Sequence, residues 1–151
     1  MSLKIIHTAD WHLGQTFFGY DRDEEHEAFL SWLIDILTLR QTDVLLIAGD
    51  VFDVANPSAA AQRRFFRFLR EANRRNPQLQ IVIIAGNHDS AARLEAPIPL
   101  LEELNTSIVG AVPRTDLCKI DFDSLLIPLY NKEGKREAIC LAVPYLRQGD
   151  Y

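Results

Sequence analysis

Three short apolar segments, each followed by a stretch of helical periodicity, constrain the fold of this chain most strongly. The apolar segments are residues 3–8, 44–48 and 81–85. The helical stretches are residues 23–39, 58–75 and 91–104, and Pro97 and Pro99 predict that the last one bends or restarts. Parallel strands in α/β proteins are apolar on both faces, as these segments are. The three β-α units therefore predict a parallel sheet with right-handed crossovers.

The pattern changes near Ser107, beyond which the apolar stretches become shorter. Strand-like pieces follow at residues 107–109, 117–122, 125–129 and 138–143. The turn sequence Asn131-Lys132-Glu133-Gly134 separates the last two pieces and predicts a hairpin. No linker or low-complexity segment interrupts the 151 residues, so the sequence indicates no domain boundary.

The composition excludes several classes of protein. The chain is 48% hydrophobic and 25% charged, which is typical of a globular protein rather than a disordered one. Its longest apolar segments are far too short to span a bilayer, and the N-terminus has no secretory pattern. Because two cysteines cannot build a disulfide framework, we interpret Cys118 and Cys140 as small buried residues of a reduced, cytoplasmic protein.

The charge of the chain gives a mixed indication about nucleic acids. The formal net charge is −5, from 16 basic and 21 acidic residues, which disfavours a simple electrostatic nucleic-acid binder. This net charge does not disfavour a protein that binds phosphate groups through bound metal ions. Four arginines of the second helical stretch share one helix face: Arg63, Arg67, Arg70 and Arg74. This arginine face is either a solvated surface or a contact for DNA phosphates.

Potential metal ligands follow all three early strands. Asp10 and His12 follow the first strand, Asp50 the second, and Asn87, His88 and Asp89 the third. Because the carboxyl ends of parallel strands lie at one edge of a sheet, these side chains should converge. A single aspartate after a strand is commonly a turn or cap residue, but three such motifs after consecutive strands are not explained in that way. Carboxylate, imidazole and amide together predict a mixed nitrogen and oxygen site for Mn²⁺, Fe²⁺ or Zn²⁺.

These motifs resemble those of a known family. Asp10-x-His12, Gly49-Asp50-x-x-Asp53 and Gly86-Asn87-His88-Asp89 are similar to the first three motifs of the calcineurin-like metallophosphoesterases. Residues 7–14 and 48–53, and Glu25-His26-x-Ala28-Phe29-Leu30 in the first helix, resemble the SbcD-like DNA nucleases of that superfamily. The resemblance covers about residues 4–104. It implies a β-sandwich flanked by helices, an α/β fold in which residues 1–151 form the N-terminal part of the phosphoesterase domain.

The resemblance also implies a function, namely hydrolysis of DNA phosphodiester bonds with two divalent ions, most simply Mn²⁺. It assigns Asp10 and His12 to the first ion, Asp50 as a bridge between both, and Asn87 to the second. His88 would stabilise or protonate the leaving oxygen, and Asp53 resembles the aspartate that orients this histidine. The implied partners are DNA, an SbcC-like ATPase subunit and a second copy of the nuclease. The arginine face would lie near the contact between the two copies of the nuclease.

Four further residues have simpler expectations. His7, inside the first strand, is interpreted as a core or supporting group, and His26 as a surface or packing histidine. Asp89 is expected to cap the third helix. Trp11 would either stack on a substrate base or form a wall of the site.

No histidine follows His88, whereas the family completes its metal centre with later Gly-His and Gly-His-x-His motifs. We therefore expect these 151 residues alone to have an incomplete metal centre and no useful nuclease activity. Two other interpretations stay open: a phosphoesterase that acts on small phosphoesters, and a non-catalytic module that binds DNA or a partner. The presence of His88 and Asp53 disfavours the module, because neither is needed for folding or for metal binding alone.

Overall fold

The computed structural model describes residues 2–101, 104–117, 119–148 and 150. The strands are β1 (Ile5–Thr8), β2 (Thr16–Phe17), β3 (Tyr20–Asp21), β4 (Val44–Ala48), β5 (Gln80–Ile84), β6 (Thr106–Val109), β7 (Leu126–Tyr130) and β8 (Arg136–Leu141). The α-helices are α1 (Asp23–Leu39), α2 (Ala59–Arg75), α3 (Ala91–Glu95) and α4 (Ile98–Leu101), and a 3₁₀ helix, η2, spans Asp123–Leu125.

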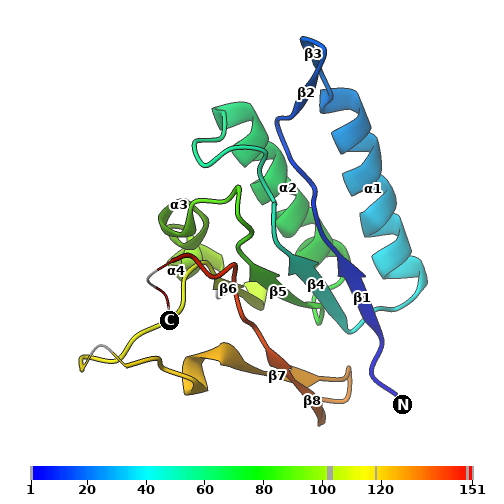
Figure 1. Cartoon of the computed structure of the whole chain (residues 1–151). Helices are drawn as coiled ribbons and strands as arrows, with labels where there is room; N and C mark the ends of the chain where they lie inside the picture. The colour runs from blue at the N-terminus through cyan, green and yellow to red at the C-terminus, as the bar shows by residue number, and fades with distance from the viewer. Residues whose placement is uncertain (1, 102–103, 118, 149, 151) are drawn as a thin grey trace.

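A four-stranded parallel sheet forms the centre of the molecule, with the strand order β1-β4-β5-β6. Helices α1 and α2 lie side by side on one face of this sheet, and the hairpin β7–β8 lies against the other (Figure 1). The register pairs Thr8 with Ile47 and Ala48 with Ile84, so β1, β4 and β5 end close to one another. The predicted parallel β-α units are confirmed, and β6 adds a fourth parallel strand.

The helices begin and end close to their predicted bounds. Helix α1 covers the predicted residues 23–39. Helix α2 follows Ser58, whose Oγ accepts a hydrogen bond of 3.1 Å from the main-chain N–H of Ala61 and so caps the helix. The third helical stretch is divided into α3 and α4 at Pro97, as predicted, because a proline cannot continue the hydrogen-bond pattern of a helix.

The helical face of the sheet carries the larger apolar core. Leu37, Phe65 and Leu69 are fully buried there between α1, α2 and the sheet. Arg64 is also buried, and its guanidinium pairs with Asp23 and Glu27 of α1 at 2.8 and 2.9 Å. These ion pairs tie α1 to α2.

One large apolar residue of α1, Trp32, lies outside the buried face of the helix. The spacing places Trp32 with Leu33 and Leu37, but its side chain is 56% exposed. The buried positions are instead Leu30 and Ile34, which flank Leu33 and Leu37 on the face toward the sheet. The rotation of the helix about its own axis against the sheet decides which apolar residues are buried. The spacing of apolar residues alone does not decide which of two adjacent helix faces is turned toward the sheet.

The other face of the sheet is covered by the hairpin. Val44 and Val82 of the sheet belong to one buried cluster with Leu129 of β7. The side-chain amide of Gln80 both donates to and accepts from the main chain of β7, at 3.2 and 2.6 Å. The turn closes where Oδ1 of Asn131 accepts two main-chain hydrogen bonds of 3.0 Å. The predicted hairpin is therefore confirmed.

Two predictions about the remaining segments need correction. His7 is exposed, not part of the core, because β1 is an edge strand and the side of the sheet that bears His7 is open there. The described part of residues 117–122 forms an isolated bridge at Ile120 in place of a strand, because the chain turns back on itself. Cys140 is half-buried in β8, and Cys118 lies outside the described residues. Among the described helices, none has the length and apolar character needed to cross a bilayer.

Candidate metal centre

The loops that follow β1 and β4 run beside each other at the carboxyl edge of the sheet. The main-chain N–H of Asp10 donates to the carbonyl of Gly49 at 3.1 Å, and that of His12 donates to the carbonyl of Asp50 at 2.9 Å. The parallel pairing of the two strands thus continues into the loops that carry the candidate ligands. Residues about 40 positions apart in the sequence are fixed side by side.

Three candidate ligands converge as predicted. Asp10, His12 and Asp50 each offer one ligand atom, and these atoms all lie within 4.8 Å of one another. Nε2 of His12 is 3.9 Å from Oδ2 of Asp50. Asn87 lines the same open cavity as Asp10 and Asp50, with a volume of about 310 Å³. The geometry therefore brings all four predicted ligand residues to one place.

The backbone of three candidate ligand residues adopts a conformation that residues with a side chain rarely adopt. The φ angles of Asp10, His12 and Asp50 are 56°, 48° and 48°, in the left-handed region. Such strain is common at functional sites, where the surrounding contacts hold it in place. Gly86 completes the arrangement, because a Cβ there would collide with Oδ1 and the main-chain nitrogen of Asp50. The close approach of the β4 and β5 loops therefore requires glycine at this position.

A buried aspartate that sequence reasoning interpreted as a helix cap holds these two loops together. The carboxylate of Asp89 is fully buried and accepts hydrogen bonds from Gly86 (2.9 Å), Phe52 (3.0 Å) and Val51 (3.2 Å) main-chain N–H groups. The N-cap of α3 is Ser90, so the cap prediction for Asp89 is wrong. Asp89 is a positioning residue, because it fixes the loop after β4 relative to the loop after β5.

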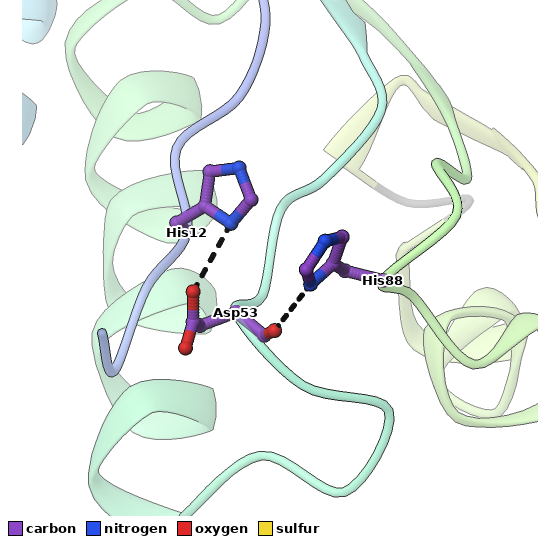
Figure 2. A group of neighbouring side chains, drawn as sticks. All are labelled: His12, Asp53 and His88. Atoms are coloured by element: carbon purple, nitrogen blue, oxygen red, sulfur yellow. Dashed lines mark hydrogen bonds and ion pairs between the residues drawn. The ribbon is translucent and has the colours of Figure 1, made fainter. Parts of the chain in front are cut away.

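Asp53 contacts both histidines of the site (Figure 2). Its carboxylate Oδ1 lies 3.2 Å from Nδ1 of His12 and also accepts a hydrogen bond of 3.3 Å from the side chain of Gln15. Its main-chain carbonyl accepts a hydrogen bond of 2.7 Å from Nδ1 of His88. Asp53 thus lies beside His88, but its carboxylate contacts His12 and only its main-chain carbonyl bonds to His88.

These contacts leave Nε2 of both histidine rings available. The bond to the Asp53 carbonyl is the main reason why the pKa of His88 is raised, and the nearby carboxylates of Asp50 and Asp53 add to it. The main-chain N–H of His88 donates to Oδ1 of Asp50 at 2.9 Å, which holds that carboxylate in place. His12, Asp53 and His88 also form a second group whose potential ligand atoms lie within 4.8 Å of one another. In this structure the hydrogen bonds to Asp53 account for that closeness.

Trp11 does not have the exposure that base stacking requires. Its side chain is 5% exposed and meets the rings of Phe29 and Phe68 edge-on, at centroid distances of 5.7 and 5.1 Å. Its Nε1 donates to Oγ1 of Thr8 at 3.0 Å. The wall interpretation of Trp11 is therefore the one that agrees with the structure.

The arginine face of α2 is present on the surface. Arg63, Arg67, Arg70 and Arg74 are all exposed. Two of them are paired with carboxylates: Arg67 with Glu27, and Arg74 with Glu71 at 2.6 Å. These pairs reduce the positive charge that the face presents.

The segment after β8 also reaches the candidate metal centre, although no sequence signal indicated it. Val143, Pro144 and Tyr145 line the same cavity as the candidate ligands. The main-chain N–H of Tyr145 donates to the carbonyl of Ala85 at 2.8 Å. Arg147 then donates to the carbonyl of Asp89, also at 2.8 Å. Only the folded chain brings this segment to the end of β5.

Comparisons with known proteins agree with this geometry. Residues 3–137 match the calcineurin-like phosphoesterase family. The chain is 50% identical over 148 residues to the SbcD subunit of the nuclease SbcCD from Rhodobacter capsulatus, which covers 98% of this chain and 36% of that protein. It is 34% identical over 148 residues to the protein of the same name from Escherichia coli (98% and 34%), and 40% identical over 122 residues to that from Bacillus subtilis (81% and 31%). The chain spans about a third of the length of these relatives.

Proposed function

We propose that this chain, which belongs to the calcineurin-like phosphoesterase family, is the N-terminal part of a metal-dependent nuclease that hydrolyses phosphodiester bonds of DNA. The observation that carries the proposal is the convergence of ligand atoms from Asp10, His12 and Asp50 within 4.8 Å, beside Asn87 in one cavity. The relatives are named as part of a nuclease, SbcCD, which supports a nucleic acid as the substrate.

The donor set fits divalent metal ions. Two carboxylates, an imidazole and an amide oxygen suit an ion such as Mn²⁺ better than a soft ion that prefers thiolates. Asp10 and His12 would hold a first ion, Asp50 would be shared, and Asn87 would contribute to a second. When bound, two such ions activate a water molecule and neutralise charge on the phosphate oxygens.

The chain itself orients the two histidines for different tasks. Nδ1 of His12 faces the carboxylate of Asp53, which directs Nε2 toward the ligand Asp50, an arrangement typical of metal-binding histidines. Nδ1 of His88 donates to a carbonyl, which can only accept, so this nitrogen carries a proton. The raised pKa of His88 favours the doubly protonated ring. Nε2 of His88 would then donate a proton to the leaving oxygen of the substrate.

We propose further that the metal centre is completed by residues outside these 151. An ion held by only Asp50 and Asn87 has few preorganised ligands, so its affinity should be low. This chain alone should therefore lack useful nuclease activity. In the intact protein we expect the partners to be DNA, an SbcC-like ATPase subunit and a second copy of the nuclease.

The test is a comparison of substrates with the intact protein and Mn²⁺. Hydrolysis of linear duplex DNA, abolished by Asp50→Ala, is the expected result. Hydrolysis of a cyclic nucleotide without cleavage of DNA would favour a phosphoesterase of small substrates. DNA binding without hydrolysis of either substrate would favour a non-catalytic module and overturn the proposal.

A further inference from the structure

The candidate residues Asn87 and His88 lie on a loop, residues 85–90, that joins β5 to α3. The loop forms neither strand nor helix, so its position depends on individual hydrogen bonds. The carboxylate of Asp89 ties the loop to the main chain that follows β4. The main-chain carbonyl of Asp89 bonds to a different segment, which the proposed chemistry does not use.

The side chain of Arg147 is the partner of this carbonyl. Its Nη2 donates to the oxygen of Asp89 at 2.8 Å, across 58 positions of the sequence. The backbone of Arg147 is itself fixed by Asp150, whose Oδ2 accepts from the N–H of Arg147 at 2.6 Å and whose N–H donates to the carbonyl of Arg147 at 2.9 Å. A charged donor makes the stronger kind of hydrogen bond. The end of the loop is therefore held by a charged group on a well-fixed backbone.

The chain that leads to Arg147 also contacts the start of the loop. The main-chain N–H of Tyr145 donates to the carbonyl of Ala85 at 2.8 Å. Ala142 is 2% exposed and belongs to the buried cluster between the hairpin and the sheet. Residues 142–147 thus extend from this cluster to both ends of the loop.

We propose that Arg147 is a positioning residue for the reaction, because it fixes the loop that carries Asn87 and His88. The inference rests on the proposed function, in which His88 donates a proton and Asn87 holds an ion. Arg147 acts only through the loop, since its bond is to the carbonyl of the residue that follows His88.

The burial of Asp89 explains why the loss of this bond should matter. Asp89 is fully buried, so its carbonyl needs a partner. A water molecule that replaced the guanidinium of Arg147 would satisfy the carbonyl but would not hold the loop in place. A displacement of about 1 Å at a reacting group lowers the rate about 100-fold, so a small shift of His88 is enough.

The first test measures turnover of linear duplex DNA by the intact protein with Mn²⁺. Arg147→Met removes the donor, and because Arg147 is exposed the core should stay intact. We expect kcat to fall about 10- to 100-fold with little change in KM. Arg147→Lys keeps a charged donor and should restore much of the turnover. Arg136→Met, at an exposed arginine where β8 begins, is the matched control and should leave turnover unchanged.

The second test, amide hydrogen exchange of the intact protein without metal, reads the position of the loop without any reaction. The main-chain N–H groups of Gly86 and His88 both donate to carboxylates at 2.9 Å, so they should be protected. Arg147→Met should speed the exchange of these two amides about tenfold and leave the amides of β4 and β5 unchanged.

Unchanged kcat together with unchanged exchange of the loop would overturn the inference. Faster exchange throughout the sheet, with a lower free energy of unfolding in urea, would also overturn it, since Arg147 would then support the whole fold. A raised KM at unchanged kcat would instead make Arg147 a substrate contact. If the wild-type protein does not cleave DNA, the proposed function fails, and the exchange measurement alone decides whether Arg147 fixes the loop.

Discussion

The main-chain carbonyl of Asp53 accepts a hydrogen bond of 2.7 Å from Nδ1 of His88. The carboxylate of the same residue lies 3.2 Å from Nδ1 of His12. One residue therefore orients two rings through different atoms, and only one of these contacts depends on the side chain. This separation makes the roles of the two histidines experimentally distinct.

Asp53→Ala should weaken metal binding through His12 and leave the contact to His88 in place. Loss of a carboxylate that orients a metal-binding histidine typically costs about 10- to 100-fold in metal affinity. Calorimetry with Mn²⁺ on the intact protein measures this loss. If metal affinity is unchanged and only turnover falls, the carboxylate does not act through His12.

His88→Gln should have the opposite signature. Turnover should fall about 100-fold or more, as expected for a lost proton donor, while Mn²⁺ affinity stays nearly unchanged. A nuclease assay and calorimetry on the same preparation make the comparison. Equal losses of affinity and turnover would show that His88 is a ligand.

Asp89→Asn should destabilise the fold, because the amide nitrogen cannot accept the main-chain hydrogen bonds that the buried carboxylate accepts. The free energy of unfolding should fall by about 3 kcal/mol, since the loss leaves a buried N–H group unsatisfied. Urea unfolding measures it. Asp116→Asn, at an exposed aspartate, is the control and should change stability very little; a similar small effect at Asp89 would refute the positioning role.

The buried His26 should make stability depend on pH. Its pKa lies below the ordinary value of 6.5 because burial and Arg22 disfavour the charged ring. The unfolded chain therefore binds more protons than the folded one just below pH 6.5, so the free energy of unfolding falls as the pH decreases through this range. Urea unfolding at pH 7.5 and 5.5 tests the effect. His26→Leu should reduce the difference between the two pH values, and an equally large difference in the variant would assign it to other groups.

The arginine face of α2 should contribute to DNA binding by the intact protein. Arg67 and Arg74 are already paired with Glu27 and Glu71, so Arg63 and Arg70 are the residues to change. Reversal of both to glutamate should weaken binding to all DNA sequences alike and lower the slope of its salt dependence. Fluorescence anisotropy at several salt concentrations measures both. An unchanged slope would leave the arginines as a solvated surface, and a loss of dimer would indicate a role in assembly.

The amino-acid sequence by itself determined the parallel β-α units and the residues of the candidate metal centre. Apolar strands, helical periodicity and caps such as Ser58 are local signals, because each depends on residues that lie within a few positions of one another in the sequence. The convergence of Asp10, Asp50 and Asn87 also followed from the sequence, because parallel strands bring their carboxyl ends to one edge.

Only the tertiary structure decided which groups support that centre and which side chains are buried. Asp89 bonds with a loop about 40 residues away in the sequence. Asp53 uses its carbonyl for one histidine and its carboxylate for the other, and residues 143–145 reach the cavity from the end of β8. The exposure of His7 and Trp32 likewise depends on what covers an edge strand and on how α1 is rotated against the sheet. These outcomes depend on contacts between distant segments, and no local pattern of residue types specifies them.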